Sequence, residues 1–299
     1  MLMFQHELQE GVLQMNPTVL FSVRTMNDYC FREETMMKWK GVCFFTVLSI
    51  TGLGACDEDN ITSEAPARYR EAGSLTVTEK GDAPSGFEVF RPAELTGNHP
   101  VLTWQNGTAY TPAVYREFLT HLASHGYVIF AADSFLSSGS AAVRAVEWAI
   151  EQNDDSRSTY YKKLDTTATA AMGHSLGGTN ATSAATDPIF KTSVLIAPCS
   201  TRNADDLAGP TLYVAVSGDM ICLGVKRGFD DAPVEPKAYI EWQDQRHFNL
   251  QGDLGSTRPW ITAWLDFILR EDEDAGNQFR GADCGICKDQ EFEIETKGI

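Results

Sequence analysis

Basic residues are scarce in this chain. Only 24 of its 299 residues are lysine or arginine, against 41 aspartates and glutamates, and the formal net charge at pH 7 is −17. A surface of that charge repels nucleic acids and anionic lipid headgroups, so the sequence excludes a nucleic-acid partner. The chain also has no internal repeat and no long low-complexity linker. We therefore expect one folded domain after the N-terminal region.

A hydrophobic run long enough to cross a bilayer is lacking as well. The uncharged, mainly apolar stretch 42–53 is too short for a membrane-spanning helix, which needs about 20 apolar residues. It follows a basic segment at 37–41 and leads to Cys56, which small residues precede as in a bacterial lipobox. This pattern predicts a lipoprotein signal peptide at 37–55, with Cys56 as the lipidated first residue. The alternative is an ordinary secretory signal cleaved nearby.

These N-terminal features divide the chain. Residues 1–36 show no domain pattern, and we expect them to be a mis-assigned start or an unstructured extension. An acidic spacer is expected at 56–72 and the folded domain at 73–299. The predicted location is the bacterial cell envelope, with the protein lipid-anchored, periplasmic or secreted. Membrane contact is then expected only through the lipid anchor, and the oligomeric state is left open.

Histidine is rare, which narrows the choice of a catalytic base. Six are present, and residues 173–177 read Gly-His-Ser-Leu-Gly after a small apolar run. This G-x-S-x-G pattern before a predicted helix indicates a sharp strand-to-helix turn that presents the Ser175 hydroxyl as a nucleophile. In that arrangement an acid and then a histidine follow the serine along the chain. His247 alone lies beyond the motif, so it is the candidate base; the alternative is a histidine in a surface loop.

The acid is expected between these two residues, at the carboxyl end of a strand. The run 210–216 is rich in apolar and β-branched residues and reads as a strand buried on both faces. It leads into a turn at Asp219, and binding groups gather at the carboxyl ends of parallel strands. Asp219 is therefore the candidate acid. Its alternative role is a turn former hydrogen-bonded to its own backbone.

The oxyanion of a tetrahedral intermediate needs hydrogen-bond donors. One is predicted to be the backbone N–H of Leu176, directly after the nucleophile, and the other an N–H in the loop after an earlier strand. The predicted strand 100–104 is followed by a glycine-containing turn. Thr108 is the candidate donor in this turn, with Asn106 and Gly107 as alternatives.

Strand and helix patterns alternate around these residues. This alternation predicts an α/β fold with a mostly parallel central sheet, helices on both faces and a single domain. Strands are expected at 87–91, 100–104, 127–132, 168–172, 192–197, 210–216 and 238–242, and helices at 115–124, 141–152 and 259–269.

A family resemblance rests on several of these stretches. They are the turn 106–108, the segment 122–128, the serine motif, Ala197-Pro198, the segment 210–219 and the region of His247. Over roughly residues 75 to 290 the chain resembles the bacterial cutinase-like polyester (PET) hydrolases of the α/β-hydrolase superfamily. The resemblance implies the α/β-hydrolase fold and hydrolysis of carboxylic esters through Ser175, Asp219 and His247, without a cofactor or metal.

The same resemblance extends to dienelactone hydrolase-like and chlorophyllase-like enzymes. A lactone or an amide is therefore an alternative substrate, and a catalytically weak binding protein on the same scaffold is an alternative function. Family members active on aromatic polyesters usually carry an aromatic residue where this chain has Thr108, and often a tryptophan where it has Cys199. A small soluble ester is thus the expected substrate, with a polyester as the further candidate.

Four cysteines follow Cys56. An even number in an oxidising compartment indicates disulfides. Cys199 and Cys222 follow two strands that are expected to be neighbours, and a disulfide there would brace the loop of the candidate acid. Cys284 and Cys287 are candidates for a local staple. The alternative for this C-x-x-C pair, a redox or zinc motif, lacks a second pair of ligands.

Overall fold

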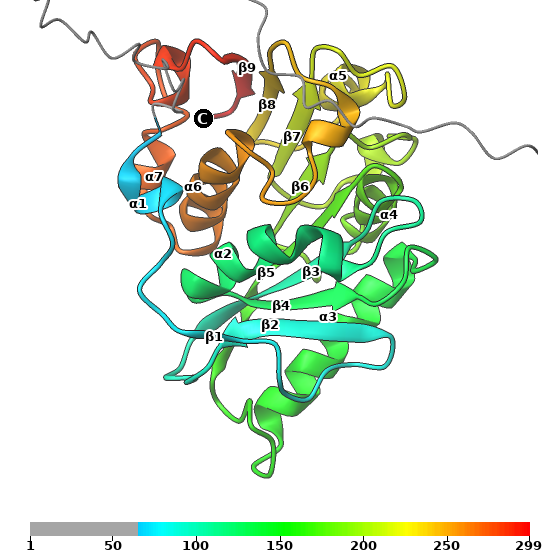
Figure 1. Ribbon diagram of the computed structural model, residues 1–299, viewed down its shortest axis with the longest axis vertical. Helices are drawn as coiled ribbons and strands as arrows, with labels where there is room; N and C mark the ends of the chain where they lie inside the picture. Colours follow the sequence, from blue (N-terminus) through cyan, green and yellow to red (C-terminus); the bar gives the residue numbers. More distant parts are fainter. Residues whose placement is uncertain (1–64) are drawn as a thin grey trace, which may run out of the picture. The chain divides into compact units, whose positions relative to one another are not determined.

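A nine-stranded sheet lies at the centre of the part of the chain that the computed structural model describes, residues 65–299 (Figure 1). The strand order is β1-β2-β4-β3-β5-β6-β7-β8-β9. Neighbours from β4 to β8 pair in parallel, whereas β1, β2 and β9 pair antiparallel at the two edges. The predicted fold class, a mostly parallel sheet of the α/β-hydrolase type, is confirmed.

The strands are β1 (Val77–Thr78), β2 (Phe87–Pro92), β3 (His99–Gln105), β4 (Val128–Ala132), β5 (Leu164–His174), β6 (Thr192–Ile196), β7 (Thr211–Val216), β8 (Lys237–Trp242) and β9 (Phe292–Lys297). The α-helices are α1 (Ala67–Arg70), α2 (Arg116–Ser124), α3 (Gly139–Asp154), α4 (Leu176–Ala184), α5 (Val225–Asp231), α6 (Thr257–Leu269) and α7 (Glu273–Gly276). Short 3-10 turns are η1 (Pro112–Tyr115), η2 (Ala204–Asp206), η3 (His247–Asn249) and η4 (Ile286–Lys288).

Helices cover both faces of the sheet because its central strands are apolar on both sides. Every residue of β3, β4, β6 and β7 is buried. Successive side chains of β7 alternate between two apolar clusters, as a strand geometry requires. The cluster on one face includes Leu122 of α2 and Trp264 of α6, and the cluster on the other includes Val146 of α3 and Phe229 of α5.

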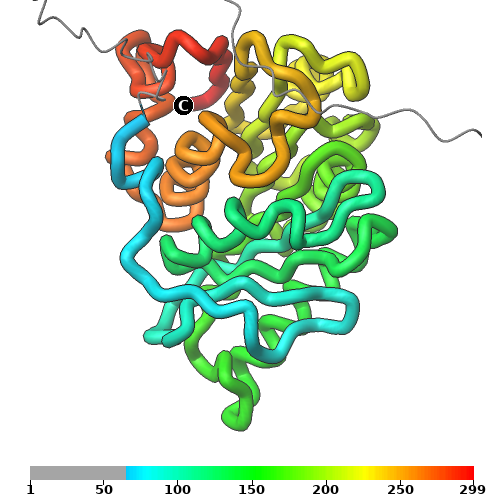
Figure 2. Tube along the Cα trace, viewed as in Figure 1, coloured from blue at the N-terminus to red at the C-terminus, as the bar shows by residue number. Residues whose placement is uncertain are grey.

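Residues 65–72, which the sequence analysis assigns to the acidic spacer, include helix α1. Helix α1 packs against α6, with the Tyr69 side chain buried, and Arg258 donates a hydrogen bond to the carbonyl of Arg70 at 3.2 Å. Figure 2 shows this first described segment running beside the chain of α6 and α7. Burial of the aromatic ring of Tyr69 stabilises the segment against the domain.

The predictions for residues 1–36, for the signal peptide at 37–55 and for lipidation of Cys56 lie outside the described residues. Within residues 65–299, no helix combines the length and the apolar character that crossing a bilayer requires.

Candidate active site

Ser175 occupies a sharp turn between β5 and α4. Its backbone has φ 60° and ψ −118°, a left-handed conformation that a non-glycine residue rarely adopts. The turn is tight: a Cβ atom at Gly177 would lie 2.0 Å from the carbonyl oxygen of Gln105, at the end of β3. Only glycine fits there. The strand-to-helix turn predicted from the G-x-S-x-G pattern is present, and it presents the serine hydroxyl at the carboxyl edge of the sheet.

His247 begins η3, in the connection between β8 and α6. Its imidazole is buried, and its Nε2 lies 2.9 Å from Ser175 Oγ. The side chain of Asn249 accepts a hydrogen bond from the Arg246 N–H at 2.9 Å, and the Asn249 N–H donates to the Arg246 carbonyl at 2.8 Å. These two bonds fix the turn that carries the imidazole.

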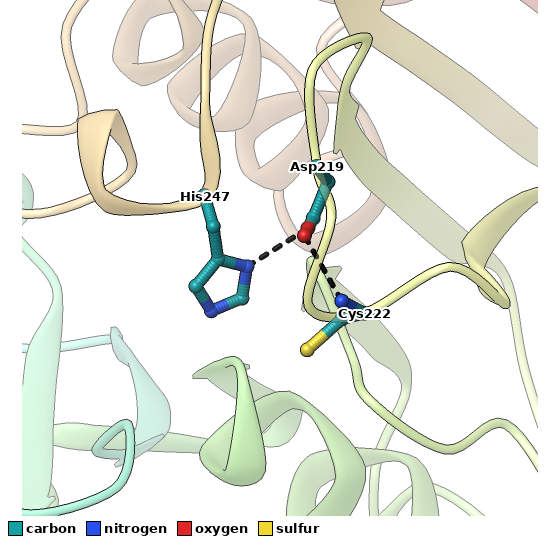
Figure 3. A group of neighbouring side chains, drawn as sticks. All are labelled: Asp219, Cys222 and His247. Atoms are coloured by element: carbon teal, nitrogen blue, oxygen red, sulfur yellow. Dashed lines mark hydrogen bonds and ion pairs between the residues drawn. The ribbon is translucent and has the colours of Figure 1, made fainter.

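Asp219 follows β7 and completes the group. Its Oδ2 lies 2.8 Å from His247 Nδ1, and its Oδ1 accepts hydrogen bonds from the backbone N–H groups of Ile221 at 2.7 Å and Cys222 at 2.9 Å (Figure 3). Burial opposes ionisation of this carboxyl, but the hydrogen bonds from Cys222, His247 and Ile221 outweigh it, so the pKa of Asp219 is lowered. One oxygen of Asp219 thus holds its own turn, and the other faces the imidazole.

The three side chains can move a proton. With Nδ1–H donating to ionised Asp219, the His247 tautomer leaves Nε2 free to accept the Ser175 hydroxyl hydrogen. The carboxylate would also stabilise the imidazolium that results. The structure therefore brings together the three residues that the order rule selects, although they come from three separate loops.

The turn after β3 lies close to this group. Asn106 is structural: its side chain accepts from Trp104 Nε1 at 3.1 Å and donates to the Ala132 carbonyl at 2.5 Å. The Gly107 N–H donates to Tyr115 Oη at 3.3 Å. The Thr108 N–H, in contrast, donates no hydrogen bond to any described residue. Leu176 opens α4, where an N–H has no intrahelical acceptor.

His174 is a site residue that sequence reasoning missed. Its ring is fully buried and lies 4.8 Å, centroid to centroid, from that of His247. Tyr115 Oη lies within hydrogen-bond distance of His174 Nδ1, at 2.8 Å, so one phenol joins the turn after β3 to the residue before Ser175. Burial first, and then the charge of His247, lower the pKa of His174 to about 3. Its place inside the serine motif was the one available signal.

Comparisons with known proteins agree with this geometry. A family model described as PET hydrolase-like matches residues 59–292. Cutinase est2 of Thermobifida alba is 28% identical over 216 residues, which cover 67% of this chain and 72% of that protein. Cutinase est1 of the same organism is 26% identical, with 67% and 73% covered, and Cutinase cut1 of Thermobifida fusca is 24% identical, with 67% of each covered.

The chain belongs to the PET hydrolase-like family. The predicted resemblance to cutinase-like polyester hydrolases and the enzyme class that it implies, carboxylic ester hydrolase, are confirmed. The match also begins before residue 65, which agrees with the packing of α1 onto the domain.

Two disulfides lie in the described part of this PET hydrolase-like chain. The structure pairs Cys199 with Cys222 and Cys284 with Cys287, the two candidate pairs of the sequence analysis. The first bridge joins the loop after β6 to the loop of Asp219, and the second closes a short turn near η4.

One group of potential metal ligands lies in the described part of this PET hydrolase-like chain. Asp219, Cys222 and His247 bring ligand atoms within 4.8 Å of one another. Their chemistry does not fit a metal centre, because the Cys222 sulfur is bonded to Cys199 and the other two side chains hydrogen-bond each other. The arrangement instead suits proton transfer.

Proposed function

We propose that this protein is a serine hydrolase that cleaves small carboxylic esters through Ser175, His247 and Asp219. The observation that carries the proposal is the continuous hydrogen-bond chain from Ser175 Oγ to His247, at 2.9 Å, and on to Asp219, at 2.8 Å. A serine hydroxyl is a weak nucleophile near neutral pH, and a base within hydrogen-bond reach is what activates it.

In the first half-reaction, Ser175 Oγ attacks the ester carbonyl carbon while His247 Nε2 takes the hydroxyl proton. The carbonyl oxygen becomes an oxyanion, which accepts hydrogen bonds from the N–H groups of Leu176 and Thr108. The unpaired Thr108 N–H supports its choice over Gly107, whose N–H bonds Tyr115. The intermediate then collapses, the C–O bond to the alcohol breaks, and His247 protonates the leaving alcohol.

The second half-reaction releases the acid from the acyl-enzyme. Water gives one proton to His247 Nε2 and attacks the acyl carbon, and a second oxyanion forms in the same place. Its collapse breaks the bond to Ser175 Oγ, and the proton on His247 returns to this oxygen. The cycle consumes one ester and one water and needs no cofactor.

A small ester is the proposed substrate, and a polyester the second candidate. The PET hydrolase-like family and the cutinase names of the relatives support ester cleavage. Thr108 and Cys199 stand where the resemblance leads one to expect aromatic residues, which favours the smaller substrate.

The test is hydrolysis of p-nitrophenyl acetate by the purified protein and by Ser175→Ala. The proposal predicts that the variant loses at least about 10⁴-fold in kcat/KM. The control is Ser183→Ala, an exposed serine on the same helix α4, which should keep the wild-type rate. Equal rates in the wild type and Ser175→Ala would remove Ser175 as the nucleophile.

We also propose that the enzyme is exported to the bacterial cell envelope, lipid-anchored through Cys56 or secreted. The support is the basic segment, apolar stretch and small residues before Cys56. Expression in a bacterium with a labelled fatty acid should label the wild type and leave Cys56→Ser unlabelled. Labelling of neither protein, with export intact, would favour the secretory alternative.

A further inference from the structure

The disulfide between Cys199 and Cys222 lies against the nucleophile. Cys199 Sγ is 3.6 Å and Cys222 Sγ is 3.9 Å from Ser175 Oγ. Both distances are van der Waals or weak hydrogen-bond contacts. An acyl carbon that bonds to Oγ, together with the first atoms of its chain, occupies the space around this oxygen. The two sulfurs therefore limit the room for the acyl group on their side.

The backbone of the same two cysteines holds the reacting groups. The Cys199 N–H donates to the Ser175 carbonyl at 3.4 Å, and the Cys222 N–H donates to Asp219 Oδ1 at 2.9 Å. Figure 3 shows the Cys222 side chain on the same loop as Asp219, near the imidazole of His247. Because both ends of the bridge are tied in this way, the sulfurs cannot move aside easily for a larger acyl group.

A cavity adjoins each end of the bridge. Cys199 lines a cavity of about 690 Å³ together with Thr201, Arg202 and other polar residues. Cys222 lines a smaller hollow of about 200 Å³ near Asp219 and Leu223. The disulfide thus borders both the Ser175 hydroxyl and the two cavities.

We infer that the Cys199–Cys222 disulfide determines acyl specificity, excluding aromatic acyl groups from the nucleophile and admitting small ones. This inference rests on the proposed function, because it assigns a substrate preference to the same Ser175 site. Breaking the bridge frees both side chains and opens the site toward the cavity beside Cys199.

The experiment compares kcat/KM for p-nitrophenyl acetate and p-nitrophenyl benzoate, which share one leaving group and differ in the acyl group. In Cys199→Ala/Cys222→Ala the benzoate-to-acetate ratio should rise at least about tenfold over the wild type, the scale on which a few pocket atoms discriminate. The matched control is Cys284→Ala/Cys287→Ala, which removes the other disulfide and should keep the wild-type ratio. Movement of Asp219 would lower the rates on both esters, so it would leave their ratio unchanged.

The outcomes separate this inference from the proposed function. Acetate turnover that depends on Ser175, with the same ratio in the wild type and Cys199→Ala/Cys222→Ala, overturns the role of the disulfide alone. Absence of Ser175-dependent turnover on acetate overturns the proposed function instead.

A second measurement needs no substitution at the site. Cys199 is exposed, so a phosphine reductant can reach the bridge. Treating Cys284→Ala/Cys287→Ala with the reductant should raise the benzoate-to-acetate ratio, and reoxidation should restore it. Mass spectrometry after alkylation verifies that Cys199 and Cys222 are reduced. An unchanged ratio in the protein so verified contradicts the inference even if the double alanine variant does not fold.

Discussion

Ser175 and the two partners in its hydrogen-bond chain, His247 and Asp219, are held in different ways. Ser175 lies in a turn packed so closely that backbone atoms fill the space around Gly177. The loops of Asp219 and His247 instead carry large apolar side chains in solvent: Met220 is 90%, Leu223 80% and Phe248 59% exposed. Hydrogen bonds hold both loops, and the bridge from Cys222 to Cys199 also holds the loop of Asp219. Position is set by packing in the first region and by individual bonds in the second.

This difference predicts which single substitutions should affect the fold and which should affect the activity. In the turn at Ser175, an added atom should disturb the fold, because the neighbouring atoms belong to the backbone and cannot move without shifting the chain. In the two loops, loss of one hydrogen bond should disturb the chemistry while the fold persists, since large side chains of both loops lie in solvent.

The largest expected loss of activity follows from a change at Asp219. Asp219→Asn keeps the shape but removes the acceptor that orients the His247 tautomer, so kcat should fall about 10⁴-fold with little loss of stability. Asp244→Asn is the matched control, because Asp244 is an exposed turn aspartate whose carboxylate contacts no described residue. Steady-state kinetics on p-nitrophenyl acetate measures both variants. Similar rates for the two would mean that Asp219 only holds its turn.

A pair of glycines tests the contrast in packing. Gly177→Ala places a Cβ 2.0 Å from the Gln105 carbonyl oxygen and should lower the free energy of unfolding by more than about 3 kcal/mol. Gly224→Ala, before α5, meets its nearest neighbour at 3.9 Å with φ −99°, and should change stability by less than about 0.5 kcal/mol. Urea unfolding measures both. Equal stabilities would remove the distinction between the two regions.

A smaller effect appears in the pH dependence of stability. His174 stays neutral when folded because its pKa is lowered to about 3, whereas the unfolded chain binds a proton below about pH 6.5. His174 therefore contributes a loss of stability as pH falls below 6.5, about 2 kcal/mol at pH 5. Asp219 does not contribute in this window: its lowered pKa gives stability that is present above its ordinary value of 3.8 and is lost only as pH falls through the lower folded value.

His174→Gln should consequently flatten the pH dependence of stability. Between pH 7.5 and pH 5, the wild type should lose about 2 kcal/mol more than the variant in urea unfolding. Parallel losses in the two proteins would show that His174 does not remain neutral in the folded turn.

The sequence predicted the features that depend on local pattern. The serine turn has a distinct glycine spacing, and the buried central strands have continuous apolar runs, so both were located. The edge strands were missed because β1 has two residues and β9 mixes charged with apolar side chains along Phe292–Lys297. Their pairing depends on neighbours distant in sequence, which no local pattern reveals.

Long-range contacts account for what was missed at the site. The link from Tyr115 to His174 spans 59 positions, and neither residue type indicates it in the sequence. The contact of Cys199 and Cys222 with Ser175 also depends on how three loops meet, although the expected neighbouring strands made these two cysteines a candidate pair.

Covalent labelling of the nucleophile tests the central claim most directly. A p-nitrophenyl alkylphosphonate mimics the tetrahedral intermediate and transfers its phosphorus to an activated serine, releasing p-nitrophenol. The account predicts one equivalent of p-nitrophenol per chain, loss of esterase activity in step with it, and the adduct mass on the peptide that contains Ser175. An adduct on another residue, or full inactivation with Ser175 unmodified, would contradict it.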